Sequence, residues 1–256
     1  DWAAKNTVDA RLKLAFWDRH DWTALAEVLK PLDMGKLLYL SGQKEVGIKN
    51  LLKATNLYSV KPEVAVKTLM IMDRLDRDVF DIVLAAIKDE NSIIRLGAAR
   101  VLANIGTGSE PVINALLKAL EDQKEYVRRE AAEALGEIGK GSEPVINALV
   151  EAIKDQDEDV PRAAVEALGN IGTGSEPVIN ALIETLKDQR YRVREAAART
   201  LGNIGTGSEP VINALIEAMK DQGIFVRRAA AEALGKIGTG SEPVINALLK
   251  ALEDQK

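Results

Sequence analysis

The chain of 256 residues lacks cysteine altogether and contains one histidine, His20. The absence of cysteine excludes disulfide bonds, cysteine-ligated metals and thiol nucleophiles. Aromatic residues make up 4% of the chain, and no apolar run reaches the length of a membrane span. The first residues also lack the charged and apolar segments of a secretory signal. We therefore expect a cytoplasmic protein that does not contact a membrane.

Groups suited to catalysis are equally scarce. His20 adjoins Asp21, but adjacent residues on a helix do not face each other, and no nucleophile is evident nearby. The stretch 139–142, Gly-Lys-Gly-Ser, lacks the Lys-Ser or Lys-Thr order of a phosphate-binding loop. We therefore predict no catalytic residue, no metal ion, no cofactor and no enzymatic reaction.

Charge is divided unevenly along the chain. Residues 1–75 contain 12 Lys and Arg against 9 Asp and Glu, whereas residues 76–256 contain 22 against 30. Nucleic acids and anionic membranes both attract a surplus of positive charge. The acidic larger part therefore argues against a nucleic-acid partner.

What the chain does contain is a repeat. The string GSEPVINAL occurs five times, first at Gly108 and then every 33 residues as far as Gly240. A unit of this length cannot bury its apolar face alone and must stack on neighbouring copies. The period therefore predicts a solenoid.

Each copy is predicted to contain two helices, A and B. In residues 107–139, Ser109 is a suitable N-cap, Pro111 falls in the first turn, and apolar residues then recur at helical spacing. After a polar bend at 121–123, a second apolar stripe continues until Gly139 ends it. Stacked antiparallel pairs of this kind form an all-α fold.

The unit resembles the HEAT repeat, in the short bacterial form related to phycobilisome-lyase repeats, and it also resembles artificial consensus HEAT-like repeat proteins. The residues that carry the resemblance are Asp122, Val127, Arg128, Ala131, Ala134, Leu135, Gly136 and Ile138. The resemblance implies a right-handed α-solenoid in which helix B lines the concave side.

The resemblance also implies a hydrogen-bonded ladder between successive units, made by the bend aspartate and an arginine of helix B. The matching pairs are Asp89 with Arg95, Asp122 with Arg128, Asp188 with Arg194, and Asp221 with Arg227. In one unit Asp155 is matched with Pro161, which cannot donate a hydrogen bond. We expect a local change of stacking there.

The strong repeat covers residues 76–256, as five regular units and a terminal half-unit. A degenerate HEAT-like repeat is expected at 43–75, with Val46, Leu51 and Leu52 in its helix A. Residues 1–42 are predicted to form irregular helices, as an N-terminal cap or the remnant of a preceding domain. Helix 241–253 has no helix B to cover it, so it is expected to fray or to pair with another copy in a homo-oligomer.

The copies differ mainly around the first turn of helix B, and this variable helix-B edge holds the three aromatic residues found after residue 106. Stripe positions carry smaller aliphatic residues, so we interpret these rings as part of a protein-binding surface. Free drift of surface positions is the alternative, and a contiguous patch would favour binding. The candidate partner-binding residues are Tyr126, Arg129, Asp157, Glu158, Asp159, Arg162, Arg190, Tyr191, Arg192, Glu195, Ile224, Phe225 and Arg228.

We therefore predict a non-catalytic protein-interaction module, a scaffold or the ligand-sensing arm of a larger protein, that binds another protein or peptide. An engineered binder or assembly scaffold is one alternative, although the irregular first 75 residues look natural. A nucleic-acid-processing HEAT-like enzyme is the other. It would need a basic groove with exposed tryptophan, and Trp2, Trp17 and Trp22 lie in the basic N-terminal part.

Overall fold

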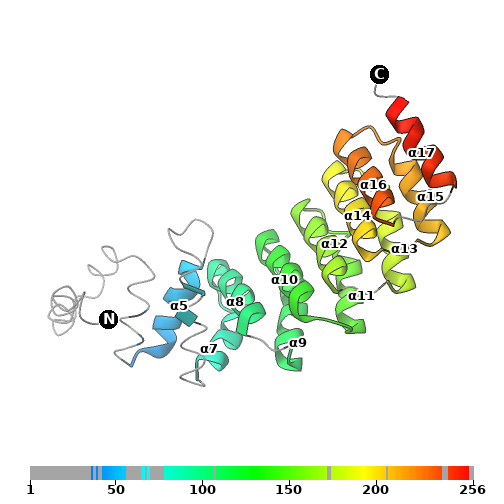
Figure 1. Ribbon diagram of the computed structural model, residues 1–256. Coiled ribbons are helices and arrows are strands. Elements are labelled where there is room, and N and C mark those ends of the chain that lie inside the picture. The colour runs from blue at the N-terminus through cyan, green and yellow to red at the C-terminus, as the bar shows by residue number, and fades with distance from the viewer. Residues whose placement is uncertain are drawn as a thin grey trace, which may run out of the picture. The chain divides into compact units, whose positions relative to one another are not determined.

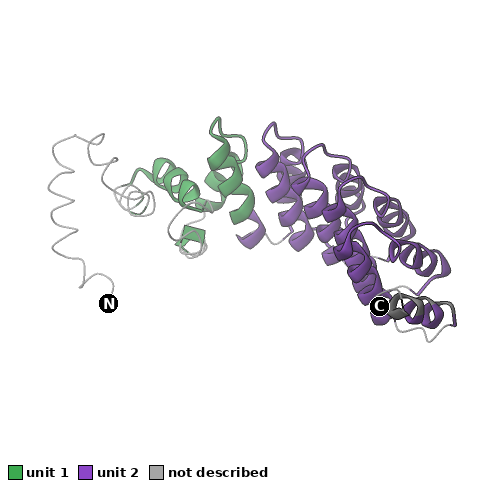
Figure 2. Ribbon diagram, turned by 90° about the horizontal axis from the view of Figure 1, so that it is seen from above, with its two compact units in different colours: residues 1–101 green, residues 102–256 purple. Residues whose placement is uncertain are grey.

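The computed structural model describes residues 36, 39, 42–55, 65, 66, 68, 69, 78–105, 108–171, 174–205, 207–237 and 242–253. Within these ranges the chain forms helices joined by turns and contains no strand. The chain divides into two compact units, residues 1–101 and 102–256 (Figure 2). His20, the three tryptophans and nearly all of the predicted segment 1–42 lie outside the described residues.

The first unit contains α5 (Lys44–Ala54), α7 (Asp78–Ala86) and the larger part of α8 (Ser92–Ile105). Val46, Leu51 and Leu52 all lie in α5, as expected; Leu51 and Leu52 are fully buried, whereas Val46 is 48% exposed. The buried stripe starts instead at Ile48, three residues before Leu51. Val46 lies two residues before Ile48, and that offset turns it to the opposite side of the helix.

The second unit alternates two sets of helices (Figure 1). The A helices are α9 (Glu110–Ala119), α11 (Glu143–Ala152), α13 (Glu176–Thr185), α15 (Glu209–Ala218) and α17 (Glu242–Glu253). The B helices are α10 (Glu125–Ile138), α12 (Asp159–Ile171), α14 (Tyr191–Ile204) and α16 (Ile224–Ile237). The most extensive packing is between neighbouring B helices, so the predicted α-solenoid is confirmed.

The repeated string GSEPVINAL forms the turn, the N-cap and the first half of each A helix. Its glycine is left-handed in two copies, with φ of +68° at Gly108 and +74° at Gly141, a conformation that disfavours other residues. Ser109 follows at the N-cap, and its carbonyl oxygen accepts the N–H groups of Val112 and Ile113 at 3.0 Å. The most repeated sequence in the chain is therefore architectural.

Glycine allows the B helices to approach closely. A Cβ atom added to Gly136 would lie 2.7 Å from Ala167 of the next B helix, and one added to Gly202 would lie 2.6 Å from Ala233. Real Cβ atoms do not come this close to a neighbouring backbone, so these two positions exclude a side chain.

The change of stacking expected near Pro161 is found between α12 and α14, which pack less extensively than the other neighbouring B helices. Thr200 of α14 stands where three other units have alanine (Ala134, Ala167 and Ala233) and faces Gly169. A Cβ atom added to Gly169 would lie 2.9 Å from the Cγ2 atom of Thr200. Helix α12 also begins one residue later in its unit than α10, α14 and α16 do.

No helix in the described part of the chain is both long and apolar enough to cross a membrane.

Candidate protein-binding surface

The bends between helices A and B are held by a repeated ladder of aspartate and arginine. The carboxylate of each bend aspartate accepts a hydrogen bond from the backbone N–H group two residues later in the chain, at 2.7–2.9 Å. Each helix-B arginine donates from Nη1 to the carbonyl oxygen of the aspartate in its own bend, also at 2.7–2.9 Å. The bend and the start of helix B are therefore joined within the four units that carry this arginine.

The same arginine connects one unit to the next. The Nε and Nη2 atoms of Arg128 bind the Asp155 carboxylate at 2.6 and 2.9 Å, and those of Arg194 bind Asp221 at 2.7 and 2.9 Å. The expected hydrogen-bonded ladder between successive units is therefore present. Within a unit the arginine contacts the aspartate carbonyl, whereas the carboxylate pairs with the arginine of the preceding unit.

The ladder lowers the pKa of its aspartates. Hydrogen bonds from Arg194 lower the pKa of Asp221, and those from Arg190 lower the pKa of Asp188; partial burial raises both by less. The ionised carboxylates are therefore stabilised in the folded state.

We expect the free energy of unfolding to decrease when the pH falls below about 4, the ordinary pKa of an aspartate. A carboxylate with a lowered folded pKa stabilises the fold above its unfolded pKa and loses this effect as the pH falls through the folded value. Urea unfolding followed by circular dichroism at about pH 7 and about pH 3 measures the difference. Asp221→Asn should reduce that difference, whereas Glu137→Gln, an exposed substitution on α10, should leave it as in the wild type. Equal pH dependence in Asp221→Asn and the wild type would contradict the assignment.

Pro161 stands where a ladder arginine belongs, and Arg190 of the next unit replaces it. Asp188 follows Pro161 by 27 residues, the spacing that joins Arg128 to Asp155. The Asp188 carboxylate is bound instead by Nε and Nη2 of Arg190, at 2.9 and 2.8 Å. The Nη1 atom of Arg190 donates to the Asp155 carbonyl at 2.8 Å. Arg190 thus makes both contacts expected of an arginine at position 161, and the structure gives this candidate partner-binding residue an architectural role.

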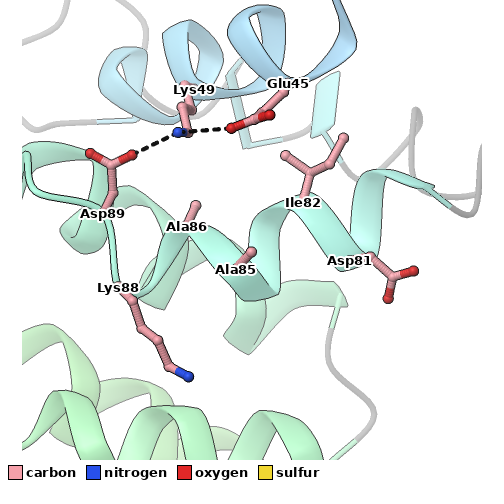
Figure 3. Close-up of a pocket in the computed structure, with 8 residues that line it drawn as sticks. All are labelled: Glu45, Lys49, Asp81, Ile82, Ala85, Ala86, Lys88 and Asp89. Atoms are coloured by element: carbon pink, nitrogen blue, oxygen red, sulfur yellow. Dashed lines mark ion pairs between the residues drawn. The ribbon is translucent and has the colours of Figure 1, made fainter.

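Lys49 plays a similar part in the first unit, beside a pocket of about 450 Å³ between α5 and α7 (Figure 3). The residue 27 positions before Asp89 is Pro62, which carries no positive charge. Lys49 binds Asp89 and Glu45, both at 3.0 Å. Lys49 therefore offsets part of the negative charge that Asp89 and Glu45 bring to this pocket.

The pocket has a counterpart in the second unit, a groove of about 350 Å³ between α9 and α11. Five residues that line this groove are the repeat equivalents, 66 residues later, of five residues that line the first pocket. They are Ala148, Glu151, Ala152, Lys154 and Asp155. The two grooves therefore occupy equivalent places in the repeat. The described residues also contain no cluster of three or more acidic or histidine side chains arranged to hold a metal ion.

A second set of variable residues on the B helices forms ion pairs within each helix. Arg129, Arg162 and Arg228 pair with a glutamate four residues later, whereas in α14 both signs are reversed and Glu195 pairs with Arg199. The pair is retained although its members change. In the first unit the equivalent residue, Leu96, is 5% exposed and belongs to the core. Variation at these positions has an explanation inside the molecule.

Large exposed apolar side chains meet at the first turns of α14 and α16. The rings of Tyr191 and Phe225 stack with their centroids 6.3 Å apart and their planes at 28°. The two side chains are 41% and 51% exposed, and Ile224 is 63% exposed. These three residues are the aromatic patch.

Gly223 makes room for the aromatic patch. A Cβ atom added to Gly223 would lie 3.6 Å from the Cβ atom of Tyr191. The other regular units carry Asn91, Lys124, Asp157 or Arg190 at this position. A long side chain there would extend beside Tyr191, and glycine leaves that space open.

The remaining candidate residues lie along the same edge but outside the patch. Tyr126, at the start of α10, is half-buried. Two repeats later, in α14, the same position of the repeat is occupied by Arg192. The acidic residues Asp157, Glu158 and Asp159 are half-buried. The Asp157 carboxylate accepts the N–H group of Asp159 at 3.1 Å, and the Asp159 carboxylate binds Arg162 at 3.3 Å. Two of the three acidic side chains therefore have partners within the fold.

The model of HEAT repeats matches residues 48–136, 80–168, 113–192, 146–222 and 179–256, which together run from 48 to the end of the sequence. The chain belongs to the HEAT-repeat family. No curated protein matches this HEAT-repeat chain.

Solved structures of repeat proteins are similar to this HEAT-repeat chain. An engineered protein shares 30% identity at a TM-score of 0.50, over 68% of this chain and 89% of its own. A designed armadillo repeat protein in complex with the peptide (KR)4 shares 21% identity at 0.50, over 74% and 99%. The archaeal HEAT-like repeats protein from Thermococcus onnurineus NA1 shares 14% identity at 0.51, over 82% and 95%.

Proposed function

We propose that this chain is a non-catalytic protein-interaction module that binds a partner protein or peptide through the aromatic patch on the variable helix-B edge. The observation that carries the proposal is the exposed stack of Tyr191 on Phe225, continued by Ile224. Exposed aromatic residues grouped in one place are typical of the centres of protein interfaces. A contiguous patch favours binding over free drift of surface positions.

The packing of the repeat supports this interpretation. The stripe positions of the B helices are filled by buried alanine, valine and leucine, so the rings are not needed to complete the core. The described large apolar side chains exposed elsewhere in the second unit are Ile245 and Leu249, both on α17. Homo-oligomer formation through that helix stays a prediction, separate from the patch.

The comparisons support a binding role at the level of the fold. The similar designed armadillo repeat protein was solved with a bound peptide. Stacked helical repeats expose continuous surfaces along which an extended chain can lie. A peptide or an exposed segment of a protein is therefore the kind of partner that we propose.

Replacing Tyr191 and Phe225 together by alanine is expected to weaken partner binding at least tenfold, because grouped aromatic residues contribute most of the affinity of an interface. The free energy of unfolding should change by less than about 1 kcal/mol, since both rings are substantially exposed. Isothermal titration calorimetry with a partner recovered by affinity capture measures the affinity, and urea unfolding measures the stability.

The matched control for this variant is Tyr126→Ala, which removes a ring from the same edge outside the patch. We expect it to retain wild-type affinity. Equal affinity of the wild type and the Tyr191→Ala, Phe225→Ala variant would disprove the proposed function.

A further inference from the structure

We propose that the aromatic patch accepts a segment in which an acidic residue adjoins a large apolar residue, with Arg192 binding the carboxylate. The inference rests on the proposed function and adds the charge of the partner. It follows from the different hydrogen bonds made by three neighbouring arginines, Arg190, Arg192 and Arg194.

Two of these arginines are committed to the ladder. Arg190 uses Nε, Nη1 and Nη2 in hydrogen bonds to Asp188 and Asp155. Arg194 uses the same three atoms in hydrogen bonds to Asp188 and Asp221. Both side chains are largely buried, 26% and 14% exposed respectively. Neither guanidinium can turn toward a partner without breaking the ladder.

Arg192 lies between them in sequence and is exposed to solvent. Its guanidinium carbon lies 5.8 Å from the centre of the Tyr191 ring, and its Nε donates to the Tyr191 hydroxyl at 3.2 Å. No other hydrogen bond of Arg192 occurs among the described residues. Because a guanidinium has five N–H donors in a planar fork, both terminal nitrogens can bind a carboxylate while the group stays beside the ring.

The acidic residues of α12 attract Arg192 without pairing with it. Glu158 and Asp159 act on Arg192 through their charge, and Asp159 already binds Arg162. Their field orients the guanidinium but leaves its N–H groups available to an incoming carboxylate. A charge-assisted, two-point hydrogen bond to a carboxylate is the strongest contact that such a group can make.

The order of side chains along the stack decides the sign of the partner's charge. Glu158 and Asp159 lie on α12, Arg192 and Tyr191 on α14, and the apolar Ile224 and Phe225 on α16. An apolar side chain that covers the patch therefore lies beside Arg192, whose guanidinium carbon is 5.8 Å from the centre of the Tyr191 ring. A basic residue next to that side chain would face a like charge, which is unfavourable, whereas an acidic residue would find a partner.

A random library of displayed twelve-residue peptides tests the inference with the whole chain as bait. Peptides that also bind the Tyr191→Ala, Phe225→Ala variant are removed before sequencing, so the remaining peptides require the aromatic patch. We expect these to be enriched in Asp or Glu next to Phe, Trp, Leu or Ile. One selected peptide is then synthesised together with a copy in which its acidic residue is replaced by lysine, and both are titrated by fluorescence anisotropy.

Reversing the charge of Arg192 supplies the second readout. Arg192→Glu should weaken binding of the acidic peptide about tenfold, the loss of one exposed charge-assisted contact, and should strengthen binding of the lysine copy. Lys118→Glu lies on α9, in the same compact unit (residues 102–256) but outside the patch. It changes the net charge of the chain equally and should leave both affinities unchanged. Circular dichroism of each variant confirms that the fold is retained.

The outcomes separate this inference from the proposed function. Patch-dependent peptides that are basic or uncharged next to their apolar residue would overturn the inference and leave the proposed function standing. Equal binding of the acidic peptide by the wild type and Arg192→Glu would overturn it as well. Failure to recover any patch-dependent peptide would count against both.

Discussion

Gly202→Ala is expected to lower the free energy of unfolding by about 2 kcal/mol, whereas Gly235→Ala is expected to raise it by about 0.5 kcal/mol. The two glycines occupy equivalent positions in successive B helices, each after a leucine. A Cβ atom at position 202 would lie 2.6 Å from the Cβ and 2.7 Å from the Cα of Ala233. At position 235 it would meet none of the described atoms within 4 Å.

The opposite signs follow from two competing effects. Alanine has a higher helix propensity than glycine, which favours both substitutions. At position 202 the added methyl group forces α14 and α16 apart, and overpacking of this kind costs more than the propensity contributes. Urea unfolding followed by circular dichroism measures both variants, and Gly136→Ala should behave as Gly202→Ala does. A stabilised Gly202→Ala variant would show that the B helices can separate without loss.

Arg190→Ala is expected to destabilise the chain by about 2 kcal/mol, because it leaves the Asp188 carboxylate without its arginine and one backbone carbonyl without its donor. The additional substitution Pro161→Arg should restore at least half of this loss. An arginine at position 161 of α12 would stand where Arg128 stands in α10, within reach of the Asp155 carbonyl and the Asp188 carboxylate.

A double-mutant cycle over positions 161 and 190 tests this exchange. The interaction free energy between the two substitutions, measured by urea unfolding, should be at least about 1 kcal/mol. Arg192→Ala is the matched control, since it removes a neighbouring arginine that is exposed, and it should change the stability by less than about 0.5 kcal/mol. Additive effects of Pro161→Arg and Arg190→Ala would contradict the replacement of one ladder arginine by the other.

The helices of the repeat could be predicted from the sequence because their signals are local. Ser109 at the N-cap, Pro111 in the first turn and Gly139 after helix B bound elements that the structure places where the period predicts them. Burial within a helix is less local. Val46 lies in the expected helix but is exposed, and Leu96 is buried although the equivalent residues of the later repeats are charged.

The candidate surface could be predicted only as a set of positions. The sequence indicated that the edge varies and carries rings, but it did not distinguish Tyr126 from Tyr191, or Arg190 from Arg192. The distinction depends on contacts between residues about one repeat apart, such as Tyr191 with Phe225 and Arg190 with Asp155. A side chain of the same type therefore has a different role in each unit, according to what the neighbouring unit places beside it.

By itself the sequence determined the period, the two helices of each unit and the family, because caps, breakers and apolar stripes act within a few residues. The tertiary structure decided how the ladder connects successive units, which arginine replaces the one missing at Pro161, and which rings meet in the aromatic patch. These contacts depend on the separation and rotation of neighbouring helices. Small residues such as Gly202 and Gly223 influence both, because they leave space for the neighbouring repeat. No pattern within one repeat contains that information, since it arises only when two repeats pack together.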